Sequence, residues 1–413
     1  MAATTDGGNG TGGIDTTTGI TDTNDIRETT DTNDMTDANN SMTTMTGHER
    51  GPANADAERV RQLGAIHRPV LLDECVRLVT SGLAKAEAPV IVDCTLGLAG
   101  HATAFLKAAP HARLVGIDRD AEALGLATER MEREGLAERF IPVHAAFDGF
   151  TQALDAHGIG RVDAAFMDLG LSSLQIDETD RGFSYSHDAP LDMRMDVAQP
   201  LTAAAVLERY DERALTRIFR TYGEERFARQ IARRIVERRA QEGPLTTSAQ
   251  LNRLVDEVVP KAHRPAGNPA KRVFQALRIE VNGELDKLAS TLPQIALRLA
   301  PHGRIVVESY HSLEDKTVKS FMAQGLTADV PPDMPIVPAE ARPFFRALTR
   351  GALKADADEI AANPRSASVR LRAVELLRPL PRHVVERFGD AALARDGAGA
   401  EPVRNRRRQA GRN

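Results

Sequence analysis

The strongest constraint on the fold is an alternation of short apolar runs with helix-like stretches that begins at Val90. The apolar runs are typical of buried strands and cover residues 90–94, 114–118, 140–144 and 162–168. Helical spacing occupies the intervals near 100–109, 119–134 and 148–157. This repeated order of strand and helix predicts an α/β fold with a parallel, doubly wound sheet.

A fifth candidate strand, 304–309, follows only after about 135 residues. Most of that interval shows helical spacing and many Arg–Glu pairs, which predicts an inserted helical domain. A Pro-rich segment covers 330–343, and the alternating run 368–374 is a candidate for the last strand.

The two ends of the chain differ in composition from the rest. The first 50 residues hold 15 Thr, no aromatic residue, and nine acidic against two basic side chains, so they cannot bury enough apolar surface to offset chain entropy. Five parts are therefore expected: a disordered Thr/Asp/Gly-rich extension (1–60), the first part of the sheet domain (61–190), the inserted helical domain (191–299), the second part of the sheet domain (300–380) and a flexible Arg-rich tail (381–413).

Composition excludes several classes of protein. No apolar stretch approaches the roughly 20 residues of a membrane helix, so we expect no membrane contact. The N-terminus lacks the basic residues followed by an apolar run that are typical of a secretory signal. The chain has two cysteines, Cys75 and Cys94, which cannot form a disulfide framework or a Cys-rich zinc site. Both observations indicate a reducing cytoplasm. With no Trp and 4% aromatic residues, any nucleic-acid contact must depend on charge and backbone.

The ends of the first three candidate strands suit a nucleoside cofactor. A loop of small residues, 93–101, follows the first strand, although a plain tight turn would look the same. Asp118 ends the second strand 21 residues after Gly97, where a carboxylate can accept both ribose hydroxyls. Phe147 follows the third strand and could pack on an adenine ring or belong to the core. Nicotinamide dinucleotide and S-adenosylmethionine both fit, but the loop lacks the G-x-G-x-x-G spacing for a pyrophosphate, which favours S-adenosylmethionine.

Asp168 ends the fourth strand and would face the crevice beside the cofactor. Methyl transfer to an exocyclic amine needs acceptors for N–H groups that become acidic as positive charge develops. Asp168 could supply one, or it could cap local structure. Asp192, Arg194 and Asp196 could likewise serve the site or form a surface ion-pair cluster.

Nine ordered motifs resemble the bacterial 16S ribosomal RNA cytosine-N4 methyltransferase family, the methyltransferase H family, over roughly residues 65–376. They are His67-Arg-Pro-Val-Leu-Leu-Asp-Glu, Thr95-Leu-Gly-Leu-Ala-Gly-His, Asp168-Leu-Gly-Leu-Ser-Ser, Arg181-Gly-Phe-Ser, Pro190-Leu-Asp-Met-Arg-Met-Asp, Tyr222-Gly-Glu-Glu-Arg, Phe274-Gln-Ala-Leu-Arg-Ile, Val281-Asn and His311-Ser-Leu-Glu-Asp.

The resemblance implies a class I (Rossmann-like) methyltransferase sheet with an inserted helical domain. It also implies N4 methylation of a decoding-centre cytidine in 16S ribosomal RNA, within the small ribosomal subunit, with S-adenosylmethionine as donor and no metal. Asp168 is the catalytic candidate. The implied cofactor contacts are Ala99, Gly100, His101, Asp118, Phe147, Asp168 and Gln175.

Three positions depart from the family pattern. Ala99 stands where Gly is usual, so a loop that requires positive φ there would have to shift. Leu174 replaces the usual Pro before Gln175, and Tyr310 replaces the commoner Phe before His311-Ser-Leu-Glu-Asp.

Two other functions stay open: a non-catalytic RNA-binding or assembly factor on a methyltransferase fold, and a nicotinamide dehydrogenase. DNA is not expected as a substrate, because DNA cytosine-N4 methyltransferases typically carry a Ser/Asp-Pro-Pro-Tyr/Trp motif where this chain has Asp168-Leu-Gly-Leu. A homodimer is compatible with the sequence.

Basic residues of the inserted helices could grip RNA phosphates, or they could pair with neighbouring glutamates as an ordinary solvated surface. These residues are Arg229, Arg233, Arg234, Arg238, Arg239, Lys261, Arg264, Lys271 and Arg272.

Overall fold

A computed structural model describes residues 69–393, except 84–85, 172–180, 184–186, 265–266, 329, 331–333 and 335. The expected extension 1–60 and residues 394–413 of the expected tail lie outside this part of the chain. Among the helices it contains, none is long and apolar enough to cross a membrane.

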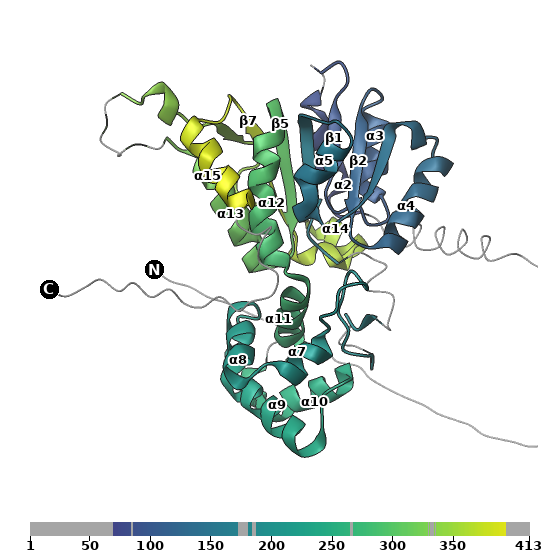
Figure 1. The fold of residues 1–413 in the computed structure, drawn as a ribbon, viewed down its shortest axis with the longest axis vertical. Helices are drawn as coiled ribbons and strands as arrows, with labels where there is room; N and C mark the ends of the chain where they lie inside the picture. Colours follow the sequence, from purple (N-terminus) through teal and green to yellow (C-terminus); the bar gives the residue numbers. More distant parts are fainter. Residues whose placement is uncertain are drawn as a thin grey trace, which may run out of the picture. The chain divides into compact units, whose positions relative to one another are not determined.

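Seven strands form one sheet in the order β3-β2-β1-β4-β5-β7-β6 (Figure 1). The first five strands of this order run parallel, whereas β7 is antiparallel to both of its neighbours. The strands are β1 (Val90–Asp93), β2 (Arg113–Asp118), β3 (Phe140–His144), β4 (Val162–Asp168), β5 (Leu299–Ser309), β6 (Phe345–Ala347) and β7 (Arg370–Leu376). The expected α/β fold with a doubly wound sheet is therefore confirmed, and β6 is a strand that the sequence did not indicate.

Helices cover both faces of the sheet because its strands are apolar on both sides. Within β1, Ile91 packs on one face and Val92 on the other, in two separate buried clusters. The first face is covered by α2 (Leu72–Thr80), α3 (Gly100–Ala108) and α4 (Ala121–Arg133). The second face is covered by α5 (Phe150–Ala156), α12 (Glu284–Arg298), α13 (Ser312–Leu326) and α15 (Arg382–Leu393), and the short helix α14 (Ala357–Ala362) precedes β7.

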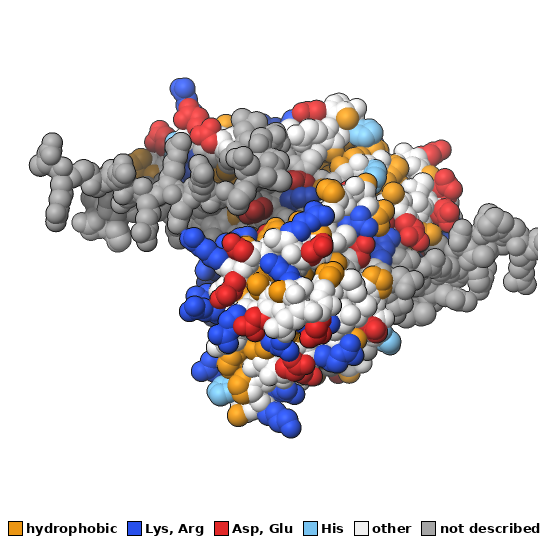
Figure 2. All heavy atoms as spheres, turned by 60° about the horizontal axis from the view of Figure 1, so that its bottom comes forward, with side chains coloured by type: hydrophobic (Ala, Val, Ile, Leu, Met, Phe, Trp, Pro, Cys, Tyr) orange, Lys and Arg blue, Asp and Glu red, His pale blue; other side chains and the backbone are white. Residues whose placement is uncertain are grey.

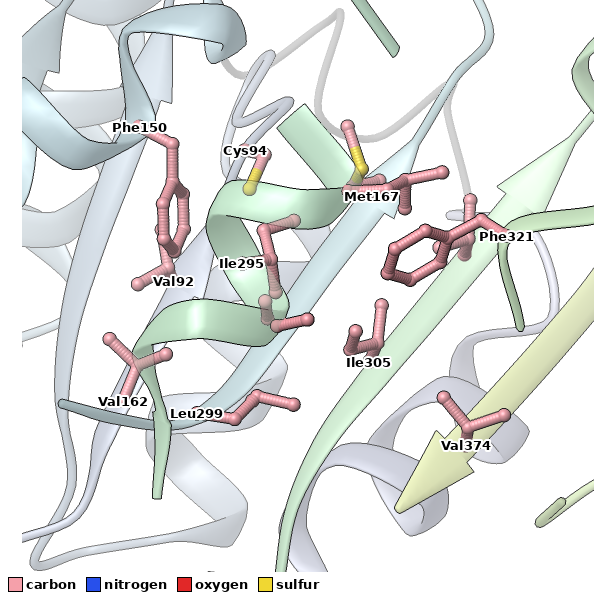
Figure 3. Close-up of a cluster of buried hydrophobic side chains, with 14 of the residues drawn as sticks. Val92, Cys94, Phe150, Val162, Met167, Ile295, Leu299, Ile305, Phe321 and Val374 are labelled. Atoms are coloured by element: carbon pink, nitrogen blue, oxygen red, sulfur yellow. The ribbon is translucent and has the colours of Figure 1, made fainter. Parts of the chain in front are cut away.

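The second face has a dense core in which α12 is central. Figure 3 shows Ile295 of α12 among Val92, Phe150 and Met167, which come from β1, α5 and β4. Each of these side chains is fully or almost fully buried. Burial of apolar side chains contributes roughly 1.5–3 kcal/mol for each large residue, so α12 is bound firmly to the sheet.

The helices between β4 and α12 pack around a core of their own, which contains Leu215, Phe219, Ile231 and Leu277. They are α7 (Ala203–Arg209), α8 (Glu212–Thr221), α9 (Ala228–Glu242), α10 (Ser248–Val258) and α11 (Lys271–Asn282). Because α12 packs on the sheet, we propose that the insertion expected at 191–299 ends near Gly283, whose φ of 62° ends α11 and begins α12.

Candidate active site

Four acidic residues stand at the carboxyl ends of neighbouring strands. Asp93, Asp118 and Asp168 are the last residues of β1, β2 and β4, and Glu308 pairs in register with Asp168. Strand order reverses between β1 and β4, and ligands of open α/β sheets bind at the carboxyl edge beside such a reversal. The topology therefore brings together the two aspartates singled out from sequence, Asp118 and Asp168.

The Asp118 carboxylate organises the loops around it. Its Oδ2 accepts a hydrogen bond from the backbone N–H of Gly97 (2.7 Å), and its Oδ1 accepts one from Asp120 (2.9 Å). Burial raises the pKa of Asp118, and these two donors oppose the rise. A carboxylate has about four acceptor positions, so two remain for a ligand.

The loop after β1 turns through left-handed backbone. Gly97 has a φ of 51° and Ala99 a φ of 58°, and Ala99 is fully buried immediately before α3. The departure from Gly at position 99 therefore places a methyl group in a conformation that L-residues adopt at a cost of about 1–2 kcal/mol. Gly100 has a different constraint, because a Cβ there would lie 2.7 Å from Cγ of Pro69.

His101 lies in the interior. Its side chain is 7% exposed, its Nε2 is 3.0 Å from the carbonyl oxygen of Val70, and its ring centroid is 4.7 Å from that of Phe166. Burial lowers the pKa of His101, with Asp168 opposing the shift. The imidazole is thus a neutral group beneath the loop, with Nδ1 3.9 Å from Oδ2 of Asp168.

Asp168 is partly exposed, with 29% of its side chain open to solvent, whereas Asp93 and Glu308 are buried. Its backbone N–H donates to Oγ1 of Thr95 (2.6 Å), and the N–H of Gly170 lies 3.4 Å from its Oδ1. Thr95 thereby ties the end of β4 to the loop after β1. This carboxylate can meet a ligand that enters from the carboxyl edge.

Asp93 and Glu308 form a buried acidic layer behind Asp168. Burial raises the pKa of Asp93 to about 8, with Asp168 and Asp118 adding to the rise. Burial also raises the pKa of Glu308 well above its usual range, and Asp168 again adds to the effect. Both oxygens of Glu308 are buried, and the thiol of Cys75 and the imidazole of His101 are the polar groups that lie against them.

Of the two remaining expected contacts, Phe147 is the one that lies among the described residues. Phe147 follows β3 at the start of a short 3-10 helix (Phe147–Gly149), where it is partly buried against the core of the second face. Gln175, together with the departure at Leu174, lies outside the described residues.

The segment that contains Asp192, Arg194 and Asp196 is built around a local ion pair. Arg194 donates from Nε and Nη2 to the two carboxylate oxygens of Asp192, both at 2.8 Å. Buried Asn282 of α11 fixes the same segment, because its amide donates to the carbonyl of Met193 (2.8 Å). These contacts favour the ion-pair interpretation for Asp192 and Arg194.

Arg278 of α11 joins the insertion to the sheet. It donates to both oxygens of Glu284 (2.9 and 2.7 Å) and lies 3.7 Å from Oε1 of Glu314 in α13. The second oxygen of Glu314 accepts the backbone N–H groups of Tyr310 (2.8 Å) and His311 (3.2 Å). Sequence motifs that lie far apart along the chain therefore converge beside the end of β5.

Two groups of side chains within the described residues have metal-ligand character. The atoms of Glu284, His311 and Glu314 lie within 4.8 Å of one another, but the Arg278 guanidinium already supplies a positive charge between the two carboxylates.

The second group is Cys75, His101 and Glu308, all of them buried. A thiolate, an imidazole and a carboxylate form a donor set of the type that binds zinc. Burial raises the pKa of the Cys75 thiol, however, and the imidazole Nε2 already meets a backbone carbonyl.

The arginines considered for RNA binding are largely paired. Arg229, Arg233, Arg234 and Arg238 lie 3.2–3.5 Å from glutamate oxygens, and Arg239 donates to two backbone carbonyls. Figure 2 shows Lys and Arg side chains interspersed with Asp and Glu on this side of the insertion. For these five residues the contacts favour an ordinary solvated surface over a dedicated phosphate-binding face.

Sequence reasoning quoted Thr95, Tyr310 and Glu314 within or beside motifs but gave them no role at the site, and it did not single out Glu308. Glu308 left a signal, because it is an acidic residue inside the otherwise apolar run of β5. Thr95 and Glu314 could not be identified from their own neighbourhoods, because their partners at the site come from distant elements.

The strand order with a reversed β7, together with acidic residues at the ends of β1, β2 and β4, defines the class I methyltransferase fold. Residues 64–377 match the MraW methylase family. The chain belongs to this family.

Relatives with named functions are close in sequence. The chain is 74% identical over 327 residues to the ribosomal RNA small subunit methyltransferase H of Bifidobacterium longum (strain DJO10A), covering 79% of this chain and 90% of that protein. It is 54% identical over 316 residues to the protein of the same name from Clavibacter michiganensis subsp. michiganensis (strain NCPPB 382), covering 76% and 98%. A solved putative rRNA-methylase from Clostridium thermocellum is 12% identical, with a TM-score of 0.34, over 74% of this chain and 94% of that chain.

Proposed function

We propose that this chain is an S-adenosylmethionine-dependent methyltransferase that modifies the exocyclic N4 of a cytidine in the decoding region of 16S ribosomal RNA. The observation that carries the proposal is the placement of a partly exposed Asp168 beside Asp118 at the carboxyl edge of the sheet, in a chain that matches a methylase family over residues 64–377. The names of its relatives support ribosomal RNA as the substrate.

The residues at this edge fit the cofactor. Asp118 keeps two acceptor positions for ribose hydroxyls after binding two backbone N–H groups. Gly97 adopts a left-handed conformation in this loop and carries no side chain, so the backbone can approach a ligand closely there. When bound, S-adenosylmethionine supplies an electrophilic methyl group on its sulfonium. Ala99, Gly100 and His101 would line its amino-acid end.

Phe147 and Gln175 would complete the cofactor contacts. Phe147 would pack against the adenine, because it begins the short helix that follows β3, the strand paired with that of Asp118. The donor's methyl group is already electrophilic, so the reaction does not require a metal.

Asp168 would interact with the exocyclic N4 amino group of the target cytidine. Its carboxylate would accept a hydrogen bond from the N4 amino group and so direct the nitrogen lone pair toward the methyl group. As the new C–N bond forms in place of the donor's S–CH3 bond, the nitrogen becomes positive and its protons become acidic, and one of them is then released to water. The negative charge of Asp168 then stabilises the transition state more than the ground state.

The substrate would be the small ribosomal subunit rather than free RNA. A cytosine amine inside paired RNA lies in a deep, narrow groove, so the enzyme needs a base that is already unpaired or is extruded. We further propose that the protein acts in the cytoplasm, with no membrane partner and no DNA substrate, and that it could act as a homodimer.

The proposal is tested by incubating purified protein with labelled S-adenosylmethionine and small subunits that lack the modification. We expect label in 16S ribosomal RNA, recovered as N4-methylcytidine after nuclease digestion. Binding of the cofactor without transfer would instead support a non-catalytic assembly factor. Failure to bind it at all would remove the methyltransferase assignment.

A further inference from the structure

Tyr310 lies directly against Asp168. It follows the last residue of β5, and the β4–β5 register pairs Asp168 with Glu308, which brings Tyr310 beside Gly170. A Cβ built on Gly170 would be 3.0 Å from Cε2 of Tyr310 and 3.5 Å from Oδ1 of Asp168. The tyrosine ring and the carboxylate therefore border the same small space.

The ring edge of Tyr310 and the carboxylate of Asp168 face the same point above Gly170, which places the phenol to donate a hydrogen bond to Asp168. Burial is the largest cause of a raised pKa of Tyr310, and the charge and hydrogen bond of Asp168 add to it. The phenol therefore keeps its proton and can share it with the carboxylate in a hydrogen bond. Two other contacts of this carboxylate are long: Gly170 N–H to Oδ1 at 3.4 Å and His101 Nδ1 to Oδ2 at 3.9 Å.

The backbone that carries Tyr310 is firmly held. Its N–H donates to Oε2 of Glu314 (2.8 Å), and Glu314 is 3% exposed. Arg278 lies 3.7 Å from the other oxygen of Glu314 and is itself bound by both oxygens of Glu284. A buried charge network thus fixes the turn after β5, and with it the position of the phenol.

We propose that Tyr310 is a positioning residue, which orients the Asp168 carboxylate toward the amine that is methylated. The inference rests on the proposed function, because it assigns Tyr310 a role through Asp168. A partly exposed carboxylate can rotate about its side-chain bonds, and each unproductive orientation lowers the fraction of complexes ready to react. A hydroxyl held by a rigid turn restricts that rotation.

Phenylalanine is the sharpest substitution, because it keeps the ring and removes only the donor. It is also the commoner residue before His311-Ser-Leu-Glu-Asp in the family that the sequence resembles, so Tyr310→Phe should fold. The matched control is Tyr210→Phe, which removes another tyrosine–carboxylate hydrogen bond, from Tyr210 to Glu280 (2.9 Å), inside the insertion.

The experiment compares full-length wild type, Tyr310→Phe and Tyr210→Phe on unmodified small subunits, with kcat and KM from labelled S-adenosylmethionine. Cofactor affinity is measured by calorimetry and folding by thermal denaturation. We expect Tyr310→Phe to lower kcat about tenfold, the size of a typical hydrogen bond to a charged group. Cofactor affinity should stay at the wild-type value, and Tyr210→Phe should keep the wild-type kcat. Both variants should lose a similar, small amount of melting temperature, because each loses one tyrosine–carboxylate hydrogen bond.

Three results would overturn the role of Tyr310 while leaving the proposed function intact. The first is a kcat of Tyr310→Phe within threefold of that of an active wild type. The second is a loss of kcat in Tyr210→Phe as large as the loss in Tyr310→Phe. The third is a loss of cofactor affinity in Tyr310→Phe that parallels its loss of kcat. An inactive wild type would overturn the proposed function, and this inference with it.

Discussion

Replacing Asp118 with alanine should weaken cofactor binding strongly while leaving the protein folded. The structure gives Asp118 two tasks, since it accepts the N–H groups of Gly97 and Asp120 and keeps acceptor positions for the ribose. Loss of two backbone hydrogen bonds at about 1 kcal/mol each costs roughly 2 kcal/mol of stability. Loss of a charge-assisted bond to the ribose costs about 1.5–3 kcal/mol, or roughly 10- to 150-fold in affinity.

Calorimetry with S-adenosylmethionine measures the affinity, and urea denaturation measures the stability. The matched control is Asp163→Ala, because Asp163 also accepts a backbone N–H, from Val90 (2.8 Å), but at the amino end of β1. We expect the control to lose about 1 kcal/mol of stability and no cofactor affinity. Unchanged affinity in a folded Asp118→Ala protein, or an equal loss of affinity in Asp163→Ala, would refute the assignment of Asp118.

Three further predictions follow from the same geometry. Asp168→Asn should lower kcat more than cofactor affinity, because the charge of the Asp168 carboxylate acts mainly in the transition state. Steady-state kinetics measures kcat and calorimetry measures the affinity. Equal losses in both would make Asp168 a cofactor anchor. Arg278→Met should cost about 3–5 kcal/mol in urea denaturation because it leaves two buried glutamates uncompensated, whereas Arg382→Met, at an exposed pair, should cost less than about 1 kcal/mol. Burial raises the pKa of Asp93 from an ordinary 3.8 to about 8. Between these pH values the folded protein holds a proton that the unfolded chain has released, so the free energy of unfolding should fall as pH rises. Asp93→Asn should make the free energy of unfolding depend less on pH in this range.

Strand positions were predictable where the chain is continuously apolar. The runs at 140–144 and 162–168 match β3 and β4 at both ends, because these strands are bounded by changes in hydrophobic pattern that a sequence displays. The strand β6 has only three residues, and it exists because β7 pairs with it, which no local pattern reports.

Helix α12 shows a second limit of sequence reasoning. Its periodicity resembles that of the helices before it, so the sequence placed it with the insertion. The buried side chains of Leu288 and Leu292 pack instead against the core of the sheet. Hydrophobic periodicity gives the face that a helix buries, but not the partner that covers it.

The candidate site also contains some residues that the sequence indicates and others that it does not. Asp118 and Asp168 could be found because they end apolar strands, and parallel strands bring such ends to one edge. The network around Tyr310 could not be found from the sequence. Its members Arg278 and Glu314 are 36 residues apart and meet only through tertiary packing. Likewise, the left-handed φ of Ala99 follows from its place before α3 and not from its residue type.

The most direct test of the central claim is a map of N4-methylcytidine in 16S ribosomal RNA from cells with and without this protein. Mass spectrometry of nuclease fragments gives the modified position and its occupancy. We predict one cytidine of the decoding region that loses its N4-methyl group when the protein is absent and regains it with the wild-type chain, but not with Asp168→Asn. Full N4 methylation of that region without the protein would contradict the account.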